Sequence, residues 1–149
     1  MEDSLTEKEQ FDVARELIRH EDGLVNNRVT WLLVLQGFLF TAFVNGIGLF
    51  EKFKERASAV TCITVGLVLI CLLGISSSIT VLNVVHIAFS QMHQVKVWWE
   101  QTGLKGKFPP VSGELGKGWF YFLFSSGRLP FFLIGAWSVL IVLLLVALR

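Results

Sequence analysis

The chain has 149 residues, of which 53% are hydrophobic, and its mean hydropathy is +0.61. One soluble core of this size cannot bury so much apolar surface, so a soluble globular domain is excluded. The formal net charge is only +1, so any basic site is local rather than a property of the whole surface. We therefore predict an all-α membrane protein with three transmembrane helices, an amphipathic N-terminal helix, and a long second helix that extends into the cytoplasm.

Residues 5–27 are expected to form the amphipathic cytoplasmic helix. Ser4 and Thr6 are each followed three residues later by Glu, which is the capping-box pattern at the start of a helix. Apolar residues then recur at spacings of three and four, with charged residues between them. These apolar positions are Phe11, Ala14, Leu17, Ile18 and Leu24. Asp22-Gly23 would end this helix and Asn26-Asn27 would cap the next, but the pattern also permits one helix that continues into the membrane.

Residues 29–50 carry no charge and have the length of about 20 residues that a helix needs to cross a ~30 Å hydrocarbon layer. Gly37, Thr41, Asn45 and Gly48 follow one another at spacings of four, four and three, which places them on one face of this first span. Small residues allow close approach of membrane helices, and an Asn needs a partner. We expect this face to meet protein or water, either in plain helix packing or as part of a pore lining.

Residues 57–95 form a second run without Asp, Glu, Lys or Arg. An unbroken helix over 57–102 would be about 69 Å long, twice the length that one bilayer crossing needs. A split at Gly74 to Ser78 would leave two spans of minimal length joined by a turn without charge, Pro or Asn. We therefore predict one span over 57–78 whose helix continues to about residue 102 as a cytoplasmic stalk.

Two faces are expected on the extended part of this second helix. The first is an apolar seam with coiled-coil-like spacing, formed by Leu82, Val85, Phe89 and Met92. It would cover the N-terminal helix, a neighbouring subunit, or both. The second is a polar line formed by Ser76, Thr80, Asn83, Ser90 and Gln94.

Residues 103–128 are expected to form a loop, since Pro109-Pro110 and several glycines lie there. Its aromatic part, 119–124, suits the membrane–water boundary. A third span is predicted over 129–148, with Pro130 in its first turn. Three crossings place nine of the thirteen Lys and Arg residues on the side of the N terminus, which the positive-inside bias assigns to the cytoplasm.

No catalytic constellation is evident in the sequence. His86 and His93 are seven residues apart, which is too far to chelate one metal ion from a single helix. Ser90 lies between them, but no acidic residue or oxyanion-hole signature completes a hydrolase site. The two histidines would also suit a pH switch. We expect no enzyme activity, no catalytic residues, no metal site and no cofactor.

The expected functional residues fall into two sets. Thr41, Asn45, Thr80, Asn83, Ser90 and Gln94 are candidates for pore lining or packing. Arg15, Arg19, Arg28, Lys96, Lys105 and Lys107 are candidates for ligand binding. Anionic lipid headgroups are the ordinary partners of such cations, and a nucleotide or oligonucleotide regulator is the more specific alternative.

A single chain with three spans is too small to enclose an ion path. Several copies around an axis would turn one polar line into a lined lumen, so a homo-oligomer in the lipid bilayer is expected, with about four copies.

The segment from Arg19 to Arg28, followed by Trp31-Leu32-Leu33 and Gln36-Gly37, resembles small multi-span bacterial membrane proteins. The plan of short cytoplasmic helices feeding three spans is similar to the membrane effectors of bacterial antiphage defence, including Hailong-type channels controlled by a nucleotide-derived ligand. This resemblance implies an oligomeric, pore-forming ion channel in the bacterial inner membrane that depolarises the infected cell when a cytoplasmic ligand sets its opening. The alternative is a non-conducting anchor or assembly subunit for a soluble partner protein.

Overall fold

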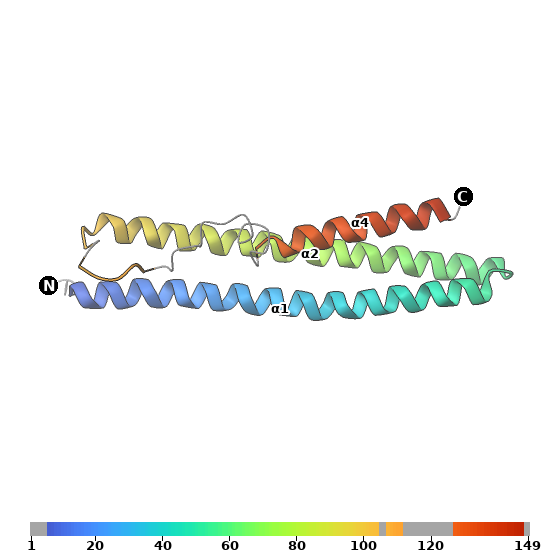
Figure 1. Ribbon diagram of the computed structural model, residues 1–149, viewed down its shortest axis with the longest axis horizontal. Coiled ribbons are helices and arrows are strands. Elements are labelled where there is room, and N and C mark those ends of the chain that lie inside the picture. Colours follow the sequence, from blue (N-terminus) through green and yellow to red (C-terminus); the bar gives the residue numbers. More distant parts are fainter. Residues whose placement is uncertain (1–5, 105–106, 112–126, 148–149) are drawn as a thin grey trace.

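The computed structural model describes residues 6–104, 107–111 and 127–147 of the chain. These residues form three α-helices: α1, Glu7–Phe53; α2, Ala57–Gln101; and α4, Leu129–Ala147. α1 and α2 run antiparallel and side by side, and α4 lies along the half of α2 nearest the connection at residues 54–56 (Figure 1). The described helices are each long and apolar enough to cross a membrane, which indicates a multi-pass membrane protein.

α1 begins with the expected capping box at Thr6. The Glu9 backbone N–H donates to Thr6 Oγ1 at 3.4 Å, and the Thr6 backbone N–H donates to Glu9 Oε2 at 2.8 Å. These bonds satisfy two donors that a helix start leaves without partners. The helix then continues through Asp22-Gly23 and Asn26-Asn27 to Phe53. Residues 5–27 and 29–50 therefore do not form two separate helices, and the continuous alternative is the one observed.

Acidification is expected to weaken this cap. The Thr6 side-chain hydrogen bond, followed by the Thr6 backbone bond, lowers the pKa of Glu9 from its ordinary value of 4.5. Because the folded pKa is the lower one, the cap stabilises the helix start above pH 4.5, and this contribution is lost as pH falls through the lowered pKa. NMR shifts of residues 7–10 should move toward coil values over that acid range. Thr6→Ala should show coil-like shifts already at neutral pH; identical titrations of the two proteins would contradict this role.

α2 runs unbroken from Ala57 to Gln101 and passes straight through Gly74 to Ser78. One line of buried and half-buried residues along it recurs at alternating spacings of four and three, the heptad period of a coiled coil. They are Leu67, Cys71, Gly74, Ser78, Val81, Val85, Ala88, Met92, Val95 and Trp99.

The expected apolar seam is partly wrong. Val85 and Met92 belong to the observed line and Leu82 is half-buried next to it, but Phe89 is 46% exposed and the buried position is Ala88. Small Ala88 lets α2 approach Val25 and Val29 of α1 closely. The Phe89 ring lies instead against Gly127, at the approach to α4, where an added Cβ would stand 2.7 Å from it.

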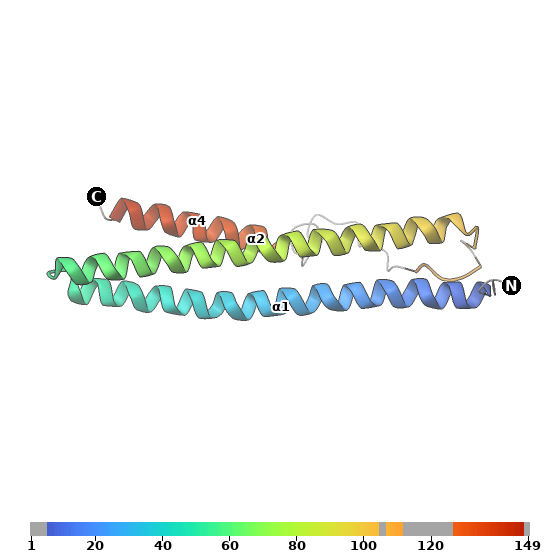
Figure 2. The same ribbon diagram turned by 180° about the vertical axis from the view of Figure 1, so that it is seen from behind.

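The molecule has two parts along its length. We call residues 29–53, 57–82 and 129–147 the bundle, and residues 7–28 together with 83–101 the stalk. α1 alone is about 70 Å long at 1.5 Å per residue, more than twice the ~30 Å hydrocarbon layer. Figure 2, which shows the molecule from behind, gives the same arrangement, with the stalk extending well beyond the start of α4. The bundle is the part whose composition suits a bilayer.

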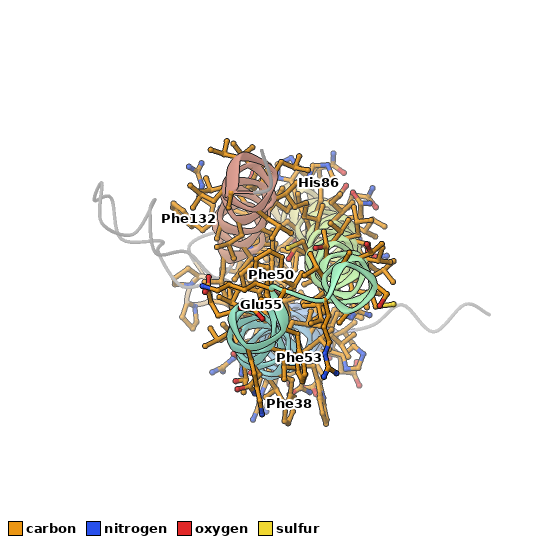
Figure 3. The ribbon with its side chains drawn as sticks, turned by 90° about the vertical axis from the view of Figure 1, so that its right-hand side faces the viewer. Phe38, Phe50, Phe53, Glu55, His86 and Phe132 are labelled. Atoms are coloured by element: carbon orange, nitrogen blue, oxygen red, sulfur yellow. The ribbon has the colours of Figure 1, made fainter. Side chains whose placement is uncertain are left out.

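The outer surface of the bundle is apolar. Trp31 is 73% exposed and Phe38 is 71% exposed. Phe38 on α1 and Phe132 on α4 project away from the other helices in the end view (Figure 3). A soluble protein rarely leaves so many large apolar side chains in water, so this surface fits a lipid environment.

The free end of the stalk is closed by a separate apolar cluster of Phe11, Ala14, Trp99 and Leu104. Phe108 stacks on Phe11 with ring centroids 5.0 Å apart, and Lys107 Nζ lies 2.8 Å from Glu7 Oε1. Gly103, at φ +71°, provides the left-handed turn by which the chain leaves α2. The expected aromatic boundary segment, 119–124, lies outside the described residues.

Candidate functional site

The most enclosed polar site in the described part of the chain is built around Gln36, in the middle of the bundle. Gln36 is 2% exposed. Its Nε2 lies 3.1 Å from each of three acceptors, the Gly74 carbonyl oxygen, Ser77 Oγ and Ser78 Oγ, which share its two hydrogens. Its Oε1 accepts a hydrogen bond from Trp137 Nε1. One amide from α1 therefore joins all three helices, and we call these groups the Gln36 network.

The serines of the network are also satisfied within their own helix. Ser77 Oγ donates to the Gly74 carbonyl at 3.1 Å, and Ser78 Oγ donates to the same oxygen at 2.7 Å. Such bonds to a carbonyl three or four residues earlier are the usual way for hydroxyls to enter an apolar environment. Because the hydroxyl hydrogens are used within α2, the two oxygens are oriented to accept from the Gln36 amide.

Trp137 is the largest side chain in the site and is completely buried. Its ring stacks on Phe40 with centroids 4.4 Å apart and meets Phe43 edge-on at 5.9 Å. The indole lies directly on Gly74, where an added Cβ would overlap it. Gly74 therefore acts as the socket for Trp137 and lets α4 approach α2 closely.

The Gln36 network contains amide, hydroxyl and indole groups and no ionisable side chain. Such groups hold helices in a fixed relation, but they supply neither a nucleophile with a base nor a charged ligand. Among the residues that the structure describes, no group of three His, Cys, Asp or Glu side chains is placed to hold a metal ion. The geometry therefore assigns this site to the positioning of α4.

All six candidate pore-lining residues lie on the outside of the single chain. Thr41 Oγ1 donates to the Gly37 carbonyl at 2.8 Å, and Thr80 Oγ1 donates to the Ser76 carbonyl at 2.9 Å. A Cβ added at Gly37 would meet nothing within 4 Å. The polar faces of α1 and α2 are thus not brought together within one copy.

The candidate ligand-binding cations are spread along the stalk rather than gathered into a pocket. Arg15 and Arg19 are exposed on α1, and Arg28 is half-buried thirteen residues beyond Arg15, about 20 Å along the helix. Lys96 is exposed on α2, and Lys107 pairs with Glu7 at the stalk end. Lys105 lies outside the described residues.

No protein family, curated protein or solved structure matches this chain. Function therefore has to be inferred from its own residues.

The Gln36 network is absent from the sequence-based site residues. One signal for it exists: Gln36 is one of two amide side chains among the mostly apolar residues of 29–50, the other being Asn45, and the Ser76–Ser78 run lies within the second apolar segment. A buried amide in a bilayer needs partners, and small hydroxyl residues on a facing helix are typical ones. Trp137 carried no comparable signal, because a tryptophan in an apolar helix also fits a lipid-facing position.

Proposed function

We propose that this chain is the subunit of a homo-oligomeric ion channel in a bacterial inner membrane, with its N terminus in the cytoplasm. The observation that supports this proposal is the exposure of Asn45 on the surface of a single copy, within the bundle, whose helices are apolar enough to span a bilayer. A lipid-facing Asn is costly because hydrocarbon offers it no hydrogen-bonding partner. Water in a lumen or a second copy of the chain would supply that partner.

Several copies around a central axis would place the polar lines of α2 next to one another. The line runs from Thr80 in the bundle through Asn83 to Ser90 and Gln94 in the stalk, so the lined path would extend beyond the membrane. Rings of small polar side chains are a known way to build a conducting path. Cyclic symmetry would also repeat Arg15, Arg19 and Lys96 around the stalk, where a phosphate-bearing regulator would meet several cations at once. A role as an effector of antiphage defence follows from this proposal through the resemblance of the architecture.

Ion flux from liposomes tests the proposal. The oligomeric mass of the purified protein is measured in the detergent used for reconstitution. Liposomes that contain the protein should release a trapped ion in at least one of two conditions, with an added nucleotide or without it. Asn83→Leu is expected to lower the flux about tenfold, because it replaces a lumen-lining amide with an apolar side chain. Val142→Leu, at an exposed apolar position of α4, is the control and should leave the flux unchanged.

Liposomes that release no ions under any condition, or equal flux from Asn83→Leu and the wild type, would contradict the channel.

The second candidate function, an anchor for a soluble partner, is supported by exposed apolar residues on the stalk. Leu17 is 48% exposed and Trp98 is 40% exposed there. A monomer that leaks no ions and co-purifies with one soluble protein would favour the anchor.

A further inference from the structure

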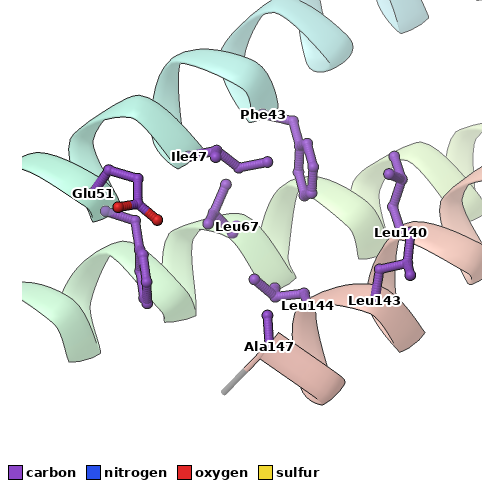
Figure 4. Close-up of a pocket in the computed structure, with 9 residues that line it drawn as sticks. Phe43, Ile47, Glu51, Leu67, Leu140, Leu143, Leu144 and Ala147 are labelled. Atoms are coloured by element: carbon purple, nitrogen blue, oxygen red, sulfur yellow. The ribbon is translucent and has the colours of Figure 1, made fainter. Parts of the chain in front are cut away.

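A cavity of about 260 Å³ opens between the three helices at the bundle end nearest the 54–56 connection. Phe43 and Ile47 of α1, Leu67 of α2, and Leu140 and Leu144 of α4 form its walls (Figure 4). Glu51, whose side chain is 69% exposed, contributes the polar part of its lining. The cavity is therefore an apolar slot with one carboxylate at its rim.

The slot exists because α4 packs tightly on the other helices at Trp137 but not at its end near Ala147. Trp137 fixes α4 against Phe40 and Gly74 through the Gln36 network. Toward Ala147 the helix diverges from α2, as both ribbon views show (Figures 1 and 2). Leu143 in this last part of α4 is 59% exposed, so the slot is open on one side.

The size and surroundings of the slot suit one acyl chain. It extends from Leu140 to Ala147, which is about 10 Å along a helix. An apolar space of this kind gains nothing from water, because its walls offer almost no hydrogen-bonding partners. Bilayer hydrocarbon is the material that surrounds this part of the bundle, and it matches the walls chemically.

The charged residues at this end of the bundle match a zwitterionic headgroup, with Glu51 at the slot itself and the cations next to it in the chain. Glu51 offers a carboxylate to an ammonium group, while the exposed Lys52, Lys54 and Arg56 offer cations to a phosphate. Lys54 Nζ lies 3.7 Å from Glu51 Oε2, an exposed contact that a headgroup can readily replace. A phospholipid with both a primary amine and a phosphate satisfies both signs of charge.

We infer that the slot is a binding site for a phosphatidylethanolamine-type lipid, with one acyl chain between α1 and α4, its ammonium at Glu51 and its phosphate at the neighbouring cations. The site requires that the bundle lies in a bilayer, but it does not require ion conduction. Failure of the lipid site and failure of the channel are therefore separate results.

The test uses the full chain in nanodiscs of equal parts phosphatidylethanolamine and phosphatidylglycerol, with a trace of either lipid carrying a photoreactive acyl chain. Cross-linked residues are mapped by mass spectrometry. The ethanolamine probe should label Leu140 and Leu144 about tenfold more than the glycerol probe. Ala147→Trp, which fills the slot from its open end, should lower that labelling about tenfold, whereas Val146→Trp, at the adjacent exposed position, should not.

Glu51→Gln keeps the slot and removes the charge, so it should retain labelling but lose the preference between the two probes. Equal labelling by both probes in the wild type would overturn the site, because it would indicate ordinary annular lipid. Unchanged labelling in Ala147→Trp would also overturn it. The same probe can be added to an oligomer purified in lipid-free detergent. If the slot residues are not labelled there, a second copy of the chain, not a lipid, occupies the slot.

Discussion

Replacing Gly74 with leucine is expected to release α4 from the other two helices, with a loss of about 3 kcal/mol of stability. Any side chain on Gly74 would overlap the Trp137 indole, and both neighbours are fixed: Gly74 by the backbone of a continuous helix, Trp137 by Phe40 and Phe43. The indole would have to leave its socket, and its contacts with both helices would be lost. SDS titration of the protein in mixed micelles measures this change, and a 5-fluorotryptophan resonance at position 137 reports whether the ring has left the bundle.

Gly66→Leu is the matched control for this experiment. It lies on the same helix, and a Cβ added there would meet nothing within 4 Å. Leucine is also a better helix former than glycine by up to ~1 kcal/mol, so this variant should be as stable as the wild type or slightly more so. In the Gly74→Leu background, Trp137→Ala should cost much less than it does alone, since the clash is then removed. Equal shifts for both glycine variants would contradict the socket.

Replacing Gln36 with leucine is expected to have the second-largest effect, about 2 kcal/mol. Ser77 and Ser78 lose one hydrogen-bond donor each, but both hydroxyls keep their own hydrogen bond to the Gly74 carbonyl. Trp137 loses more, since its indole N–H would be buried in the bundle without the Gln36 oxygen. The change should therefore appear chiefly as weaker docking of α4, measured by the same SDS titration.

Asn45→Leu is the control for the Gln36 substitution, as it removes an amide from an exposed position of the same helix. In dispersed monomers it should change stability by no more than about 0.5 kcal/mol. A double-mutant cycle between Gln36→Leu and Trp137→Phe should give a coupling energy above about 0.5 kcal/mol, because Phe cannot donate to the amide. Additive effects in the cycle would show that the bond between them contributes nothing.

The helical plan follows from the sequence because it depends on composition and length. Charge-free runs and the distance they must cover define the three spans, and the S/T-x-x-E pattern limits the start of α1 to Ser4 or Thr6, of which Thr6 is the observed cap. The choice of one helix over two within residues 7–53 does not follow, because Asp22-Gly23 and Asn26-Asn27 are compatible with a cap and with a helix interior. Contacts between Val25, Val29 and α2 favour the continuous form.

The packing is where sequence patterns were least informative. A seam containing Phe89 and one containing Ala88 differ by a single residue, and hydropathy favours the larger side chain. Ala88 takes the buried position because α1 and α2 lie close together there, which leaves room for a methyl group but not for an aromatic ring. The Gln36 network depends on residues 38 to 101 positions apart, a separation that no local periodicity reports.

The serine run at residues 76–78 shows how the same feature serves two interpretations. In sequence it is a place where the long apolar helix could be divided, but a turn there would lack charge, Pro or Asn, so an unbroken helix is predicted. In the structure all three hydroxyls bond to their own helix, and those of Ser77 and Ser78 also accept from Gln36, so this part of the run joins two helices. The predicted unbroken helix through residues 74–78 is therefore confirmed, while the part that these serines play in joining the helices was not predicted.

α1 and α2 contain no proline, and each keeps its helical form from the stalk through the bundle. Proline and interrupted hydrogen bonding are the usual causes of sharp bends, so this helix pair is mechanically a stiff rod. A twist or tilt imposed at Phe11 and Trp99 cannot be absorbed along the way, and it must reappear some 60 Å distant, at the level of Phe50. A partner that tilts the stalk would therefore tilt the bundle with it.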